Sequence, residues 1–164
     1  MNRAPLTPPY TFVLKLTDRP GGMEMIAATF AHRGISLSTS LGNDGALDPE
    51  GRATVLVTFA ATPAKKEALR RALSRLSRVV SLVEYPADSP LLRKTALIRL
   101  RGSIPEIPDG VTVERVGAGA ESAAGGGDEA TLLLVGPPRA VDAVLEAAAE
   151  RGDLGGVTHA VFAL

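Results

Sequence analysis

The stretch LTDRPGGM, residues 16–23, joins an apolar strand pattern to an amphipathic helix pattern. Asp18 is placed to cap the helix, and Pro20 is tolerated in a first helical turn. Gly21 and Gly22 let a ligand approach the backbone closely. Free amides and the positive end of the helix dipole then converge where a carboxylate could bind. Two interpretations stay open from these residues: a binding loop, or a capped strand-to-helix turn without a ligand.

Strand and helix patterns alternate on both sides of this stretch. Two segments have apolar residues at i, i+3, i+4 and i+7, which predicts amphipathic helices. The first helix ends at Arg33-Gly34, and the second opens at Thr62-Pro63. Their apolar stripes are Met23, Ile26, Ala27 and Phe30 in the first and Leu69, Ala72, Leu73 and Leu76 in the second. Strands are predicted at residues 10–16, 35–41, 53–59 and 79–85.

The order of these elements is β-α-β-β-α-β. Right-handed crossovers place both helices on one face of a shared antiparallel sheet, so the predicted fold is α+β, a ferredoxin-like sandwich. The other sheet face is left to solvent or to a partner. We expect the strand of residues 36–41 to lie at a sheet edge and to pair with its copy in a homodimer.

The second half of the chain repeats this pattern incompletely. Pro105 and Pro108 break the segment of residues 102–110, so no helix is predicted there. A helix is predicted only later, with Val141, Val144, Leu145 and Ala148 as its stripe and Arg151-Gly152 as its end. The strands fall at residues 94–100, 111–116, 131–135 and 157–164, which gives a reduced βββαβ domain. The predicted organisation is a tail at 1–9, a domain at 10–85, a linker at 86–93 and a reduced domain at 94–164.

Composition excludes several classes of function. The 18 basic and 18 acidic residues cancel, so no overall field favours nucleic acid or an anionic membrane. The absence of cysteine excludes disulfides and thiolate metal sites, and His32 and His159 lie far apart in sequence. The glycine-rich residues 117–127 lack the ending of a phosphate-binding loop and are expected to form a hairpin tip. No catalytic constellation is found, and a soluble cytoplasmic protein is expected.

Residues 14–23 and 30–41 together resemble the opening of an ACT domain. More narrowly, they resemble the acetolactate synthase small (regulatory) subunit family, in which a strand, a Pro-Gly or Ser-Gly turn, a helix ending in Phe-x-x-Arg-Gly and an Ile-x-Ser-Leu strand follow one another. Residues 93–100, RKTALIRL, are similar to the start of the C-terminal domain in that family.

The resemblance implies a non-catalytic regulator. It would bind the thiamine-diphosphate-dependent large subunit, raise its activity and confer feedback inhibition by a branched-chain amino acid, usually valine. The regulator would carry no cofactor of its own, since thiamine diphosphate belongs to the catalytic partner. In such proteins two ACT domains pair through their second strands, and the effector lies at that interface. The alternative is a free-standing ACT-type amino-acid sensor that regulates another enzyme, a transporter or a transcription factor.

The resemblance also implies where the effector binds. The expected effector-binding residues are Leu16, Asp18, Pro20, Gly21, Gly22, Met23, Ser36 and Leu37. The family commonly has asparagine at the positions of Asp18 and Ser36. Asp18 is able to hold an effector ammonium group, whereas Ser36 offers one hydroxyl in place of an amide.

Overall fold

The computed structural model describes residues 7–46, 48–116 and 129–163. The chain divides into two compact units between Ser89 and Pro90. The glycine-rich stretch expected to form a hairpin tip lies outside the described residues, as does most of the predicted tail. No helix in the described ranges is long and apolar enough to cross a membrane.

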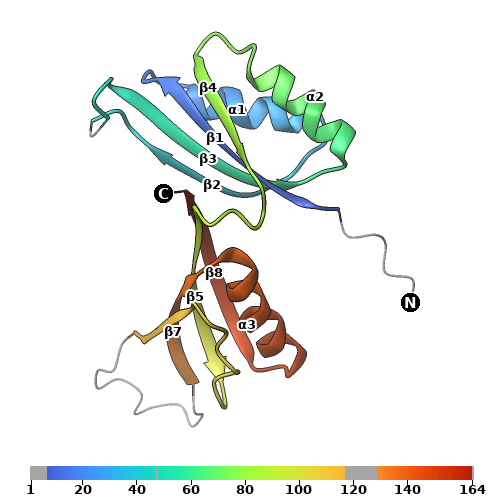
Figure 1. Cartoon of the computed structure of the whole chain (residues 1–164), viewed down its shortest axis with the longest axis vertical. Helices are drawn as coiled ribbons and strands as arrows, with labels where there is room; N and C mark the ends of the chain where they lie inside the picture. The colour runs from blue at the N-terminus through green and yellow to red at the C-terminus, as the bar shows by residue number, and fades with distance from the viewer. Residues whose placement is uncertain (1–6, 47, 117–128, 164) are drawn as a thin grey trace. The chain divides into compact units, whose positions relative to one another are not determined.

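The first unit has the predicted βαββαβ order, drawn from blue to yellow-green in Figure 1. Its sheet has the strand order β2-β3-β1-β4. Neighbouring strands pair antiparallel, and the first predicted strand, β1, lies inside the sheet between β3 and β4. The predicted edge position of β2 is confirmed. The elements are β1 (Pro9–Thr17), α1 (Gly22–Ala31), β2 (Leu37–Asn43), β3 (Arg52–Ala60), α2 (Pro63–Leu73) and β4 (Val79–Tyr85).

An aromatic cluster fills the core between this sheet and its helices. The ring centroid of Phe59 on β3 lies 4.9 Å from that of Phe12 on β1 and 5.1 Å from that of Phe30 on α1, both edge to face. All three side chains are buried. Each supplies a large apolar area, and the perpendicular arrangement suits the ring quadrupoles. The period-two and period-3.6 patterns thus converge on one core.

The ends of the helices follow their predicted signals in part. The Thr62 side chain accepts a hydrogen bond from Lys65 N at 3.3 Å, and Pro63 opens α2. Gly34 follows α1 with φ of +59°, a left-handed conformation that terminates helices. However, α2 ends at Leu73, so Leu76 packs on the core from the following turn.

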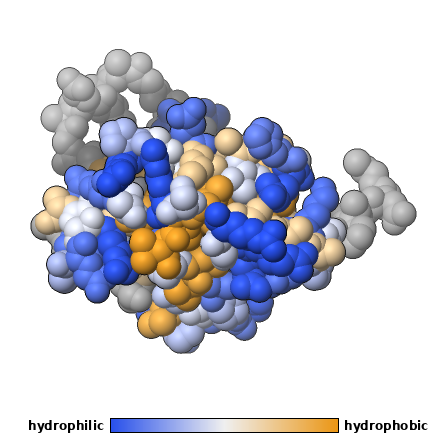
Figure 2. Space-filling view, turned by 90° about the horizontal axis from the view of Figure 1, so that it is seen from above, coloured by the Kyte–Doolittle hydropathy of each residue, from blue (hydrophilic) through white to orange (hydrophobic). Residues whose placement is uncertain are grey.

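The edge strand β4 has apolar side chains that are exposed to solvent. Val80 and Val83 are each 47% exposed. Lys15 pairs with Ser81 and Leu16 with Val79, so the register shifts at Val80, which marks a bulge or irregularity in the edge strand. Such a feature makes an edge less suitable for pairing with a foreign strand. Figure 2 shows one face of the protein, on which apolar residues (orange) gather among hydrophilic ones (blue).

The second unit has the predicted reduced βββαβ order, with strands in the order β6-β7-β5-β8. No helix lies between β5 and β6, and this whole connection is within the described residues. Pro105 is buried there, and Ile107 packs on the core of the unit. The proline-containing loop therefore supplies apolar contacts where a helix is absent. The elements are β5 (Leu92–Arg101), β6 (Thr112–Arg115), β7 (Glu129–Gly136), α3 (Pro138–Glu150) and β8 (Leu154–Ala163).

The strand β5 begins earlier than predicted. It starts at Leu92, so the last residues of the stretch predicted as a linker belong to a strand. Leu92 and Lys94 continue the alternation of buried residues that Ala96 belongs to. The apolar pattern did not include Lys94, because its side chain is charged. However, only 7% of Lys94 is exposed, and its Nζ donates a hydrogen bond to Asp142 Oδ1 on α3. Pairing with a carboxylate allows a lysine to occupy a buried strand position.

Candidate ligand-binding site

The turn between β1 and α1 depends on its two glycines. Gly21 has φ of +85°, in the left-handed region that side chains disfavour. Gly22 is buried, and a Cβ built on it would lie 3.3 Å from Leu16 Cδ1. The backbone at the start of α1 is therefore packed directly on the end of β1. This arrangement leaves the first amides of α1 without partners inside the helix.

The predicted helix cap at Asp18 is wrong. Gly21 occupies the N-cap position, and no side chain caps α1 there. The Asp18 carboxylate instead accepts a hydrogen bond at its Oδ2 from Gly45 N, at 2.9 Å. Gly45 belongs to the loop between β2 and β3 and is 27 positions away in sequence. The left-handed turn at Gly21 starts the helix too late for Asp18 to reach its amides, so this side chain links two loops.

Arg78 holds the turn from the other side. Its carbonyl oxygen accepts a hydrogen bond from Thr17 N at 2.9 Å, and its Nη1 donates to Pro20 O. The guanidinium also lies beside Gly21, since a Cβ built there would be 3.3 Å from Nη1. Arg78 precedes β4 and is 58 positions from Pro20, so the local sequence pattern held no signal for this contact. It adds a cation next to the start of α1.

Met23 closes the site toward the sheet edge. A Cβ built on Gly42 of β2 would lie 2.9 Å from Met23 Cε, so the end of this side chain lies beside the glycine. Met23 is also 37% exposed. The predicted residues Leu16, Pro20, Gly22 and Met23 thus lie around one turn, together with Asp18 and Gly21. The turn offers amides and a guanidinium for a carboxylate, a carboxylate for an ammonium group, and an apolar side chain.

The other two predicted residues lie elsewhere. Ser36 directly precedes β2, whereas Gly42 is near its end, and this length of strand spans about 20 Å. Ser36 is exposed and lines a hollow of about 330 Å³ that also includes Thr62 and Lys65. Leu37 packs on the core. Within a single chain, Ser36 and Asp18 therefore lie far apart.

Sequence reasoning expected a loop between β2 and β3 but gave it no role at the site; its described residues are 44–46 and 48–51. Asp48 Oδ1 accepts hydrogen bonds from Glu50 N at 3.0 Å and from Arg52 N at 3.3 Å, while its Oδ2 accepts from Lys15 Nζ at 2.5 Å. The hydrogen bond from Lys15, with help from the Glu50 amide, lowers the pKa of the Asp48 carboxyl below its ordinary value. The Asp-Pro-Glu-Gly sequence at 48–51 is a turn signal that marked this loop, but not its partner on β1.

This loop also borders a hollow on the first unit. Lys15 and Asn43 lie opposite Thr54 on the two sides of β3, so their side chains form a row across three strands. The row and the loop line an open pocket of about 530 Å³. Its lining residues are Lys15, Gly42, Asn43, Asp44, Asp48, Pro49 and Thr54.

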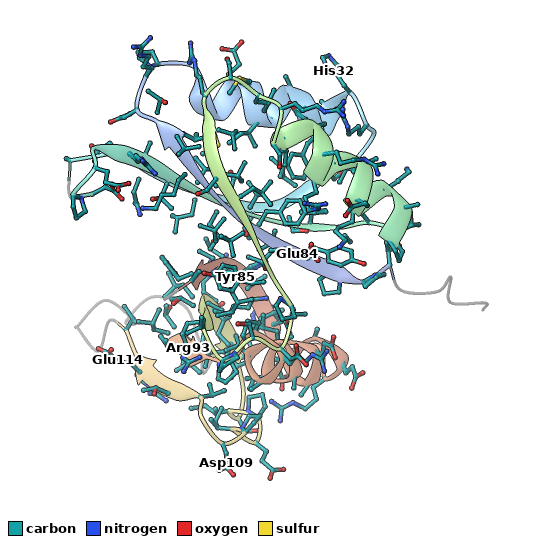
Figure 3. All side chains as sticks on the ribbon, turned by 45° about the horizontal axis from the view of Figure 1, so that its top comes forward. His32, Glu84, Tyr85, Arg93, Asp109 and Glu114 are labelled. Atoms are coloured by element: carbon teal, nitrogen blue, oxygen red, sulfur yellow. The ribbon has the colours of Figure 1, made fainter. Side chains whose placement is uncertain are left out.

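His32 and the basic residues of α2 take no part in this turn; the basic run of α2 consists of Lys65, Lys66, Arg70 and Arg71. His32 follows α1 and projects outward in Figure 3. On α2, Lys66 Nζ donates to Glu84 Oε1 of β4 at 2.8 Å, which raises the pKa of Lys66. Arg70 pairs with Glu67 at 2.6 Å. Part of the basic run on α2 is therefore paired within the chain.

Comparison with known proteins shows which sequences the chain resembles. The chain is 31% identical over 94 residues to the acetolactate synthase small subunit of Mycobacterium leprae, an alignment of 57% of this chain and 54% of that protein. It is 26% identical over 95 residues to the small subunit of Mycolicibacterium smegmatis, with 58% and 55% covered. The chain resembles acetolactate synthase small subunits. It spans about half the length of these curated relatives, and no family model matches it.

A solved structure extends the likeness to the fold. The crystal structure of the acetolactate synthase small subunit from Thermotoga maritima superposes with a TM-score of 0.62, covering 95% of this chain and 96% of that one. The two sequences are 18% identical in this comparison, so it bears on the fold alone. The resemblance to acetolactate synthase small subunits predicted from residues 14–41 is confirmed, and both units have an ACT-like fold.

Proposed function

We propose that this protein is a non-catalytic regulatory subunit of acetolactate synthase. In this role it binds the catalytic large subunit, raises its activity and carries a site for a feedback amino acid, with valine as the first candidate. The observation that carries the proposal is the sequence similarity to two small subunits of that enzyme. No cofactor is assigned to the chain itself, because thiamine diphosphate belongs to the proposed catalytic partner.

The turn between β1 and α1 is the proposed amino-acid site. An amino acid presents a carboxylate and an ammonium group within a few ångströms of each other. The first amides of α1, beside the Arg78 guanidinium, suit the carboxylate, and the Asp18 carboxylate suits the ammonium group. Met23 offers an apolar contact at Gly42 for a branched side chain. The site therefore favours a zwitterion with a small apolar side chain.

The proposed site is completed by a second copy of the chain. β2 lies at the sheet edge, so its outer backbone groups are available for a further strand. Antiparallel pairing of β2 with its copy around a two-fold axis brings the start of one strand to the end of the other. The partner's Ser36 would then approach Gly42 and Met23, which supports its assignment as an effector-binding residue.

The proposal is tested by reconstitution with the cognate large subunit. We expect the purified chain alone to convert no pyruvate, and its addition to raise acetolactate formation until the subunits are saturated. L-Valine should then lower the rate only when the small subunit is present. An equal rate with and without the chain, at every ratio of subunits, would contradict the proposal and favour a free-standing amino-acid sensor.

A further inference from the structure

The loop between β2 and β3 is tied to the β1–α1 turn by one carboxylate. Gly45 N donates to Asp18 Oδ2 at 2.9 Å, which fixes one oxygen of Asp18 and leaves Oδ1 for another donor. Gly45 itself has no room for a side chain. It is buried, and a Cβ built on it would lie 2.6 Å from the carbonyl carbon and oxygen of Gly51. The loop thus folds back on itself at the residue that contacts Asp18.

A second set of contacts anchors the same loop to β1. Asp48 N donates to Gly45 O at 3.1 Å, and Lys15 Nζ donates to Asp48 Oδ2 at 2.5 Å. The contacts therefore run from Lys15 through Asp48 and Gly45 to Asp18, and both ends of this ring lie on or directly after β1. Loosening any member of the ring frees the Asp18 side chain to rotate.

We propose that Gly45 and Asp48 are positioning residues for the amino-acid site. They hold the Asp18 carboxylate where Oδ1 meets the ligand ammonium group, without touching the ligand. This inference rests on the proposed function of the β1–α1 turn. A carboxylate held in advance loses less side-chain entropy on binding, so the anchored loop raises ligand affinity.

The ring has little reason to stabilise the fold as a whole. The Lys15 and Asp48 side chains are 37% and 15% exposed, so solvent screens the pair in part, and its contribution to the free energy of unfolding is small. A positioning role and a purely structural role therefore predict different results. Breaking the ring should weaken ligand binding in the first case and leave it unchanged in the second.

The experiment uses the full chain and isothermal titration with L-valine, L-leucine and L-isoleucine. For the tightest of these ligands, Asp48→Ala should raise Kd about tenfold. Because it also removes the hydrogen bonds from Glu50 N and Arg52 N, it should lower the melting temperature without ligand by a few degrees. Lys15→Met should weaken binding in the same direction, and Lys15→Arg, which keeps a cation for Asp48, should restore it. The matched control is Glu50→Ala, which removes the Glu50–Arg52 ion pair of 2.9 Å from the same loop and should leave Kd unchanged.

Amide hydrogen exchange at Gly45 provides a second readout. The bound ligand should slow this exchange in the parent and slow it less in Asp48→Ala, because the contact from Asp48 that helps to hold Gly45 against Asp18 is then absent. If the parent binds none of the three amino acids, the proposed function of the turn is wrong and the positioning role falls with it. If the parent binds one of them and Asp48→Ala binds it equally well, only the positioning role is overturned.

Discussion

At the scale of the residue, Gly21 and Gly34 share a left-handed backbone conformation but differ in the atoms around them. Both have positive φ, of +85° and +59°. A Cβ on Gly34 would meet nothing within 4 Å, whereas a Cβ on Gly21 would approach Arg78 Nη1. Backbone strain and interference with the proposed site can therefore be separated by comparing these two positions.

Gly21→Ala and Gly34→Ala should each lower the free energy of unfolding by about 1 kcal/mol, because alanine disfavours the left-handed conformation. Only Gly21→Ala should also weaken amino-acid binding, since its Cβ displaces the guanidinium beside Pro20. Urea unfolding and calorimetric titration measure the two effects. Equal ligand affinities in both variants would count against a site at this turn.

His159 on β8 gives the second unit a pH dependence. Although His159 is an exposed residue, partial desolvation, followed by the nearby Lys94 ammonium, lowers its pKa from the ordinary 6.5, and Asp142 opposes this in part. The imidazole is therefore protonated more readily in the unfolded chain. Its contribution to stability is fully present above pH 6.5 and is lost as the pH falls through the lower pKa of the folded state. His159→Gln should remove this part of the decrease in melting temperature, and an NMR titration of the ring should give a pKa below 6.5.

At the scale of the element, Phe59 on β3 joins three parts of the first unit. It is 1% exposed and contacts aromatic rings on both β1 and α1. Phe59→Ala should lower the free energy of unfolding by roughly 3–5 kcal/mol through lost burial and the cavity left behind. Val83→Ala on β4 is the control, because Val83 is 47% exposed and its truncation should change stability by about 0.5 kcal/mol or less. Similar losses in the two variants would show that the aromatic cluster is not the centre of the core.

The edge strand β2 makes a second prediction at this scale. We expect the protein to be a dimer in solution, paired through β2, because a strand of this length has unpaired backbone groups along its outer side. Ser40→Asp places like charges near the proposed two-fold axis and should give monomers with an unchanged circular dichroism spectrum. Light scattering of both proteins checks this, and a parent that is monomeric at micromolar concentration would contradict it.

Local patterns predicted the elements well and the contacts of the site poorly. The strands and helices follow from periodicity, and Gly34 and Gly152 mark helix ends with positive φ as expected. The partners of the turn lie outside any local window. Asp18 bonds to Gly45, and Arg78 holds Pro20, across 27 and 58 positions. The register of the sheet and the packing of Gly45 on Gly51 bring the two residues of each contact together, and the spacing of residues along the chain predicts neither feature.

At the scale of the whole molecule, each unit has its own core. The buried cluster of the first unit runs from Phe12 to Leu73, and that of the second from Ala96 to Ala148. A chain truncated after Ser89 should therefore unfold cooperatively on heating, with the secondary structure of the first unit intact. Differential scanning calorimetry and circular dichroism test this. A broad transition without a heat-absorption peak would show that the first unit depends on the second.

The internal position of β1 has a consequence for how the protein is made. β1 is synthesised first, but its two neighbours in the sheet are β3 and β4, and β4 ends only at Tyr85. At about 5–20 residues per second, a ribosome needs several seconds to add the residues between β1 and β4. Until β3 ends at Ala60, the side chains of Phe12, Leu14 and Leu16 have no neighbouring strand, and the sheet is complete only when β4 is made. The nascent chain therefore exposes apolar side chains that promote aggregation until the sheet of its first unit is complete. A chaperone that covers the N-terminal strand would raise the yield of folded protein.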